Sequence, residues 1–245
     1  MTELTIGSIG ILPKKEGRPL SRLDILRRHR IGSGTFGTAF KAEVVSGTHA
    51  RNFVVKRFKQ LERQGLITTA KENAAKAMAN YSAAKKAGLK VFPTYRLGED
   101  RESILMTSGD AKSTVCIGTE PATSLPGRGE PKIPSIESTA CASLMDRVFA
   151  QAILAANHDI SVHSDAFFFL YDTSTGGIDF VIGDLDNVSS RRLLPNESRL
   201  LSNLHSAGIA LESFVVDNVE NPGVYLKSIG EAYSETKIAQ GYSNY

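Results

Sequence analysis

Polar and apolar residues alternate along two neighbouring stretches of the chain, and this alternation predicts a pair of β-strands. Residues 38–44 read Thr-Ala-Phe-Lys-Ala-Glu-Val, and residues 52–58 read Asn-Phe-Val-Val-Lys-Arg-Phe. The intervening Ser46-Gly47-Thr48 is typical of a turn, so these strands are expected to form a hairpin. Shorter strands are predicted at 94–97 and 103–107, and a second hairpin is predicted from 167–171 and 178–182 across the turn 173–177.

Helical patterns occupy other parts of the chain. Residues 69–86 are rich in Ala, Lys and Glu, and Gly88 follows as an expected C-terminal stop. Leu144, Val148, Ile153 and Leu154 lie near helical spacing and predict a long helix. The predicted helices cover residues 69–86, 135–157, 200–216 and 225–239.

These elements predict an α+β fold in which a β-rich part precedes a helical part. Residues 1–25, which mix Gly, Pro and Lys, are expected to be a flexible lead-in. The β-rich part is assigned to 26–108 and the helical part to 109–245. The segment 109–134 is rich in Gly, Pro, Ser and Thr and is interpreted as a loop that separates the two parts.

Composition excludes some classes of protein. The chain has 245 residues, of which 41% are apolar and 22% charged, and its net charge of +3 does not indicate a general nucleic-acid binder. The basic residues between Arg22 and Arg30 are interpreted as a solvated helix face. Cys116 and Cys141 are too few for a disulfide scaffold and too far apart for a zinc knuckle. We expect both to be free thiols in a reducing compartment, with Cys141 buried on a helix.

Neither a membrane span nor a secretory signal is expected. No apolar run is long enough to cross a bilayer, and the first residues lack a charged leader followed by a long apolar stretch. We therefore expect a soluble protein that does not use the general secretory route. A monomer is the favoured oligomeric state.

The glycine-rich stretch Gly32-Ser33-Gly34-Thr35-Phe36-Gly37 has three interpretations. A P-loop requires a lysine after its last glycine, but Thr38 stands there. A dinucleotide-binding turn requires a following helix, whereas a strand is predicted here. The third interpretation fits best: a β-hairpin flap whose glycines let the backbone approach the phosphates of ATP, with Phe36 beneath its tip.

Lys56 lies at the end of the apolar run Val54-Val55 and is expected to bind the α- and β-phosphates. Such a lysine needs a carboxylate to position it. Glu72 on the following helix is the preferred candidate, with Glu62 as the alternative. Thr69 and Glu72 also have the spacing of a helix capping box, which is the competing interpretation of Glu72.

Three further residues resemble the parts of a phosphotransfer site. Asp165 follows a long helix and can accept a proton from an attacking hydroxyl, while His163 can hold the same loop by hydrogen bonding. Asp184 closes an apolar strand, where a carboxylate can hold Mg²⁺. Asp186 can share that role, although Asp184 is preferred.

In this order the motifs resemble the protein kinase family, from about residue 30 to residue 214. The correspondence covers the glycine-rich loop (32–37), the third-strand lysine (Lys56), the C-helix glutamate (Glu72), the catalytic triplet (163–165), the metal-binding triplet (184–186) and the buried F-helix (203–211). The resemblance implies a bilobal kinase-like fold with a truncated helical C-lobe, ATP and Mg²⁺ as cofactors, and transfer of phosphate to Ser or Thr of a protein.

The chain departs from the family pattern at several positions. Ser164 replaces the usual arginine, so activation through a loop phosphate is not expected. The usual metal-binding asparagine falls on Leu170, or on Phe168 if two residues are deleted, and neither can bind a metal. Asp186 replaces a glycine, and Asn203 stands where the F-helix aspartate is expected.

The short C-terminal part is similar to minimal kinases that bacterial pathogens inject into host cells. This resemblance implies a secreted effector that phosphorylates a host protein, with the chaperone HSP90 as a candidate substrate. Two alternatives remain open: a pseudokinase scaffold that binds nucleotide without turnover, and a small-molecule kinase of the aminoglycoside type.

Overall fold

The computed structural model describes most of the chain. The described residues are 7–12, 21–46, 49–63, 65–93, 95–107, 114–118, 133, 135–185, 188–189 and 196–242. The chain divides into two compact units, Met1–Tyr81 with Phe92–Gly109, and Ser82–Val91 with Asp110–Tyr245. The first unit contains a six-stranded sheet, whereas the second is dominated by long helices. The predicted α+β fold, with a β-rich part and a helical part, is therefore confirmed.

The sheet of the first unit is antiparallel and has the strand order β1-β2-β3-β4-β8-β7. Its strands are β1 (Gly7–Ile11), β2 (Ser21–Ser33), β3 (Gly37–Ser46), β4 (His49–Phe58), β7 (Tyr95–Leu97) and β8 (Ser103–Thr107). The strands predicted from β3 onward are confirmed. Ala42, Val55 and Leu105 are buried together and form the sheet core, because alternate residues of neighbouring strands point to one face.

The beginning of the chain differs from the prediction. Residues Gly7–Ile11 pair with β2, and Ile11 also bridges to Gly98, just beyond β7. Ile11 packs against the sheet core. The predicted flexible lead-in at 1–25 is therefore wrong for its described residues, because β1 gains backbone hydrogen bonds on both sides and buries an apolar side chain.

The basic stretch between Arg22 and Arg30 lies in strand β2, so its interpretation as a helix face is also wrong. Apolar Leu23 and Ile25 alternate with polar residues here, and this spacing favours a strand. Strand β2 pairs along its length with β3, with irregularities after Ile25 and Arg30.

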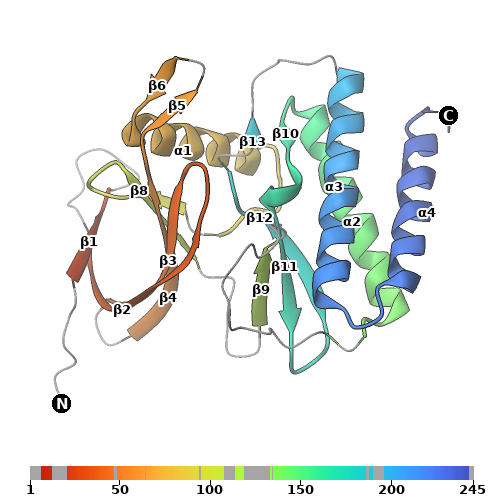
Figure 1. The fold of residues 1–245 in the computed structure, drawn as a ribbon, viewed down its shortest axis with the longest axis horizontal. Helices are drawn as coiled ribbons and strands as arrows, with labels where there is room; N and C mark the ends of the chain where they lie inside the picture. Colours follow the sequence, from red (N-terminus) through yellow and green to blue (C-terminus); the bar gives the residue numbers. More distant parts are fainter. Residues whose placement is uncertain are drawn as a thin grey trace. The chain divides into compact units, whose positions relative to one another are not determined.

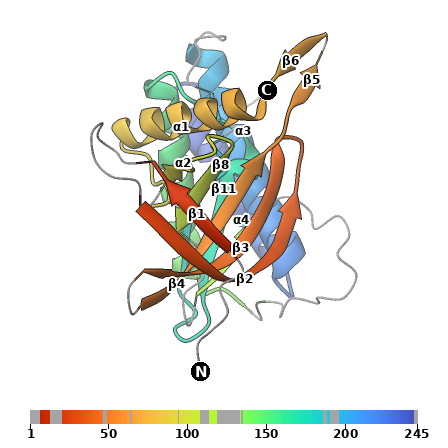
Figure 2. The same cartoon turned by 90° about the vertical axis from the view of Figure 1, so that its left-hand side faces the viewer.

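Helix α1 (Ala70–Lys86) confirms the helix predicted at 69–86. Gly88 ends it as predicted, with a left-handed φ of +83° and an N–H that donates to the carbonyl of Lys85. A short hairpin of β5 (Leu61–Arg63) and β6 (Leu66–Thr68) precedes this helix (Figure 2).

The second unit contains helices α2 (Ser138–Asn157), α3 (Asn196–Asn218) and α4 (Gly223–Ala239), which pack against one another (Figure 1). They confirm the three predicted C-terminal helices, and Leu144 and Val148 are buried as their spacing predicts. Cys116 and Cys141 are free thiols. Burial in α2 raises the pKa of the Cys141 thiol.

The second unit also contains a three-stranded sheet, ordered β12-β11-β9. Strands β11 (Phe167–Asp172) and β12 (Ile178–Ile182) form the predicted second hairpin. The expected loop at 109–134 is partly wrong, because Thr114–Gly118 forms strand β9 beside β11. Alternating apolar residues in this segment let it extend the sheet. Within the described residues, no helix is long and apolar enough to cross a membrane.

Candidate functional site

The glycine-rich loop is the turn between β2 and β3. Gly32 and Ser33 end β2, Gly37 begins β3, and the N–H of Gly34 donates a 2.9 Å hydrogen bond to the carbonyl of Gly37. The last strand pair is Ser33 with Thr38, whose hydroxyl oxygens lie 3.2 Å apart. The glycines therefore occupy a hairpin, as predicted, and not a strand-to-helix turn.

The glycines of this loop differ in whether the fold leaves room for a side chain at their positions. A Cβ at Gly37 would lie 2.1 Å from the carbonyl oxygen of Arg57, so the sheet needs a glycine there. A Cβ at Gly34 would meet no atom within 4 Å, and Gly34 does not have a left-handed φ. Thr35 is exposed and Phe36 half-buried. Since the fold itself makes no demand for glycine at position 34, the space beside it is available to a ligand.

Lys56 lies in the middle of the sheet, opposite Ala39 of β3 and Ile104 of β8. Its neighbour Val55 points into the sheet core, so Lys56 projects from the other face. The side chain is half-buried, and its Nζ lies 5.6 Å from the centroid of the Phe58 ring. Lys56 is thus a partly shielded cation on a rigid strand.

Glu72 does not take the position expected from the kinase resemblance. Its carboxylate accepts hydrogen bonds from the N–H (2.7 Å) and hydroxyl (3.0 Å) of Thr69, and its own N–H donates to that hydroxyl. These bonds lower the pKa of Glu72. Among the described residues Glu72 forms no ion pair with Lys56. The competing capping-box interpretation is therefore correct here, because the first helical turn supplies nearby donors that need an acceptor.

In the second unit, the predicted catalytic loop follows α2. The chain turns at Asp159, forms the short strand β10 (Ser161–Val162) and then a single 3₁₀ turn, Ser164–Ala166. Asp165 is half-buried in this turn, whereas His163 is exposed and its imidazole forms no hydrogen bond with the described residues. The expectation that His163 holds the loop is not supported by this geometry.

Asp165 and Asp184 lie at the same end of one β-hairpin. In that hairpin Phe167 pairs with Ile182, so the residue just before β11 and the residue just after β12 are neighbours. The N–H of Gly183 donates a 2.8 Å hydrogen bond to the carbonyl of Ala166, which fixes this arrangement. The backbone at two half-buried aspartates, Asp165 and Asp184, is thereby placed at one end of the hairpin.

Asn203 holds the segment that leads to Asp165. It is fully buried in α3, and its Oδ1 accepts a 3.0 Å hydrogen bond from the N–H of Val162. Its Nδ2 donates to the carbonyls of Ile160 (2.8 Å) and Ala152 (3.2 Å). Asn203 thus bonds the backbone of the segment that precedes Asp165 from another element.

Arg199 was missed at the sequence level. It is 1% exposed, and its Nη1 lies 2.7 Å from Oδ1 of Asp159. The sequence does contain a pattern that indicates burial of Arg199. This arginine lies four residues before Asn203, on the helix face that also carries Leu204 and Ala207. An arginine on an apolar face requires a partner, and that partner is the turn after α2.

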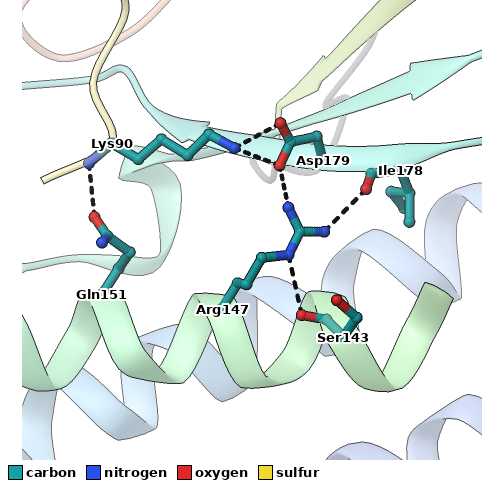
Figure 3. Close-up of polar contacts among 6 residues, drawn as sticks. All are labelled: Lys90, Ser143, Arg147, Gln151, Ile178 and Asp179. Carbon is teal, nitrogen blue, oxygen red and sulfur yellow. Dashed lines mark hydrogen bonds and ion pairs between the residues drawn. The ribbon is translucent and has the colours of Figure 1, made fainter. Parts of the chain in front are cut away.

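A second polar group missed from the sequence secures β12 (Figure 3). Asp179 accepts hydrogen bonds of 2.5 Å from both Lys90 and Arg147, and Arg147 also donates to the carbonyls of Ile178 and Ser143. Burial opposes ionisation of Asp179, but the bonds and charges of Lys90 and Arg147, with a bond from the Phe180 backbone, hold its pKa below the usual value.

The donor set suits one Mg²⁺ bound together with phosphate oxygens. Mg²⁺ commonly takes one or two protein carboxylates and completes its octahedron with phosphates and water, and Asp184 can supply one such carboxylate. Asp186 lies outside the described residues. Phe168 and Leu170, where a second ligand was sought, lie in β11. Within the described part of the chain, no group of three or more His, Cys, Asp or Glu side chains could hold a metal by itself.

Comparisons with known proteins add little. The sequence matches no protein-family profile, and it matches no curated protein. Among solved structures, a doubly substituted kinase domain of PknI from Mycobacterium tuberculosis is similar at 10% identity with a TM-score of 0.40, covering 91% of this chain and 100% of that domain. Because this TM-score is low, the residues of the chain itself must carry any functional inference.

Proposed function

We propose that this protein is an ATP- and Mg²⁺-dependent protein kinase that phosphorylates Ser or Thr hydroxyls. The observation that carries the proposal is the pair Asp165 and Asp184, held at one end of the β11–β12 hairpin by the hydrogen bond from Gly183 to Ala166. Phosphoryl transfer requires two such functions, one that orients the attacking hydroxyl and one that holds the metal. The glycine hairpin and Lys56 are the corresponding groups for the nucleotide.

Each residue has a defined role in the proposed reaction. Asp165 accepts the proton of the substrate hydroxyl as its oxygen attacks the γ-phosphorus of ATP. The bond between that phosphorus and the β,γ-bridging oxygen breaks, and ADP leaves with the electron pair. Asp184 would bind Mg²⁺, which neutralises phosphate charge. Lys56 binds α- and β-phosphate oxygens, and the flap contributes backbone contacts.

We further propose that the substrate is a host protein and that the kinase is a secreted bacterial effector. The support is the degenerate catalytic triplet: Ser164 stands where the kinase family has its regulatory arginine, and such departures resemble the minimal kinases that bacterial pathogens inject. The chaperone HSP90 is the first candidate substrate.

Transfer of label from ATP tests the catalytic proposal. The protein is incubated with γ-labelled ATP, Mg²⁺ and a eukaryotic lysate, with purified HSP90 in a parallel reaction. Asp165→Asn and Asp184→Asn should each lower transfer by about 100-fold or more. Asp172→Asn is the matched control, since Asp172 ends β11 at the other end of the hairpin and accepts a bond from Ser174. Transfer that persists in Asp184→Asn would overturn the assignment.

A pseudokinase is the second candidate, and one observation favours it. The segment where a second metal ligand was expected forms strand β11, in which Phe167 and Phe169 are fully buried, leaving no loop there. Binding of ATP shown by a thermal shift, with no labelled protein and no phosphorylated small molecule by intact mass, would favour this candidate.

A further inference from the structure

The turn between α2 and the catalytic loop has an unusual backbone. Asp159 has a φ of 61°, in the left-handed region that non-glycine residues rarely adopt. It lies two residues after Asn157, the end of α2, and two before Ser161, the start of β10. The conformation of this one residue therefore sets the direction in which the chain leaves α2 toward Asp165.

An ion pair between a buried arginine and a partly exposed aspartate accompanies this conformation. Arg199 of α3 is 1% exposed and bonds to Oδ1 of Asp159 at 2.7 Å. Burying the Arg199 charge without a partner would cost folding free energy. The pair therefore constrains the position of Asp159 more strongly than a surface ion pair would. One helical turn further along α3, Asn203 bonds to Ile160 and Val162.

We propose that Arg199 is a positioning residue for Asp165, and that Arg199 and Asn203 together hold the segment Asp159–Val162 in the geometry needed for phosphoryl transfer. This proposal rests on the proposed kinase function. It also bears on how the site is held, because the loop is bonded from within the second unit by helix α3. A displacement of about 1 Å at a reacting group can lower a rate about 100-fold, so loss of this hold is expected to affect the chemical step.

The test uses variants that distinguish loss of the ion pair from loss of the left-handed turn and from a general loss of stability. Asp159→Gly keeps the left-handed turn, because glycine adopts this φ without strain, but removes the carboxylate. The double variant Asp159→Gly/Arg199→Met removes both charges, and such replacements are often neutral for stability. We expect the double variant to remain folded with kcat lowered by about 10- to 100-fold and KM for ATP unchanged. Arg199→Lys should restore part of kcat relative to Arg199→Met.

Two controls make the result decisive. Ile229→Ala creates a cavity in α4 of the same unit, far along the chain from the catalytic loop, and should lower stability without lowering kcat. Amide hydrogen exchange of residues 160–166 should become faster in the double variant and not in Ile229→Ala. A double variant with the stability, kcat and exchange of the natural protein overturns the proposal.

Failure of the proposed function would be distinguishable from failure of this inference. If the natural protein transfers no phosphate to any acceptor, the kinase assignment fails, yet hydrogen exchange still decides whether Arg199 holds the loop. If the natural protein is active and exchange changes without any change in kcat, the pair is structural and the positioning role is wrong.

Discussion

The side-chain amide of Asn203 bonds to the backbone near Val162: its Oδ1 accepts from the N–H of Val162 at 3.0 Å, and its Nδ2 donates to the carbonyls of Ile160 and Ala152. An aspartate at this position would accept the first bond but could not donate the other two while ionised. The kinase resemblance leads one to expect an aspartate at this position, where this chain has an amide.

Asn203→Asp should therefore be strongly destabilising at neutral pH, by about 3 to 5 kcal/mol, because an ionised carboxylate would face two carbonyl oxygens in a buried site. Folding would raise the pKa of this carboxyl above its unfolded value of about 3.9. The difference from the natural protein should thus be smallest below that value and grow as pH rises through the folded pKa. Urea unfolding at several pH values measures it, and a pH-independent difference would contradict the expected ionisation.

The glycines of the hairpin flap should respond differently to alanine. Gly37→Ala places a methyl group against the carbonyl of Arg57 and should cost about 1 to 3 kcal/mol of unfolding free energy. Gly34→Ala meets nothing and should leave stability within about 0.5 kcal/mol. If the flap binds ATP, Gly34→Ala should nevertheless raise KM for ATP. An unchanged KM would show that Gly34 does not approach the nucleotide.

The cluster around Asp179 should make stability sensitive to acid. Because its pKa is lowered in the folded state, its contribution is present above the unfolded value of about 3.9 and is lost as pH falls through the folded pKa. The side chain is 42% exposed, so solvent screening limits the cost of Asp179→Asn to about 1 kcal/mol or less. Unfolding at low and high salt checks this, with Glu231→Gln on the exposed pair with Lys227 as control.

The capping box at the start of α1 leads to a prediction about Glu72. Glu72→Ala should lower stability above pH 5 and leave KM for ATP unchanged, because the carboxylate bonds to Thr69 and not to Lys56. The pKa of Glu72 is lowered in the folded state, so its contribution disappears as pH falls through that pKa. A raised KM for ATP in this variant would instead mean that Glu72 leaves Thr69 and pairs with Lys56 when nucleotide binds.

Local patterns were sufficient for most elements. The alternation in 38–44 and 52–58 predicted β3 and β4, the Ala-rich stretch with Gly88 predicted α1, and apolar spacing predicted α2. These elements follow from periodicities of two and 3.6 residues, which are properties of neighbouring residues. The lead-in predicted at 1–25 failed in part because Ile11, at the end of β1, also bridges to Gly98, which is remote in sequence.

The sequence by itself determined which chemical groups this protein has and in what order: the glycine hairpin, Lys56, Asp165 and Asp184. Only the tertiary structure decided what holds them. Asp165 and Asp184 lie at the same end of one hairpin because two strands pair in one register. The loop before Asp165 is held by Asn203 and Arg199 on a helix that follows it in the chain. Such contacts join residues that are remote in sequence, and burial alone makes their polar bonds obligatory. Glu72 is the opposite case. Its partner in the fold is Thr69, a neighbour in sequence, and not a residue that is remote in sequence.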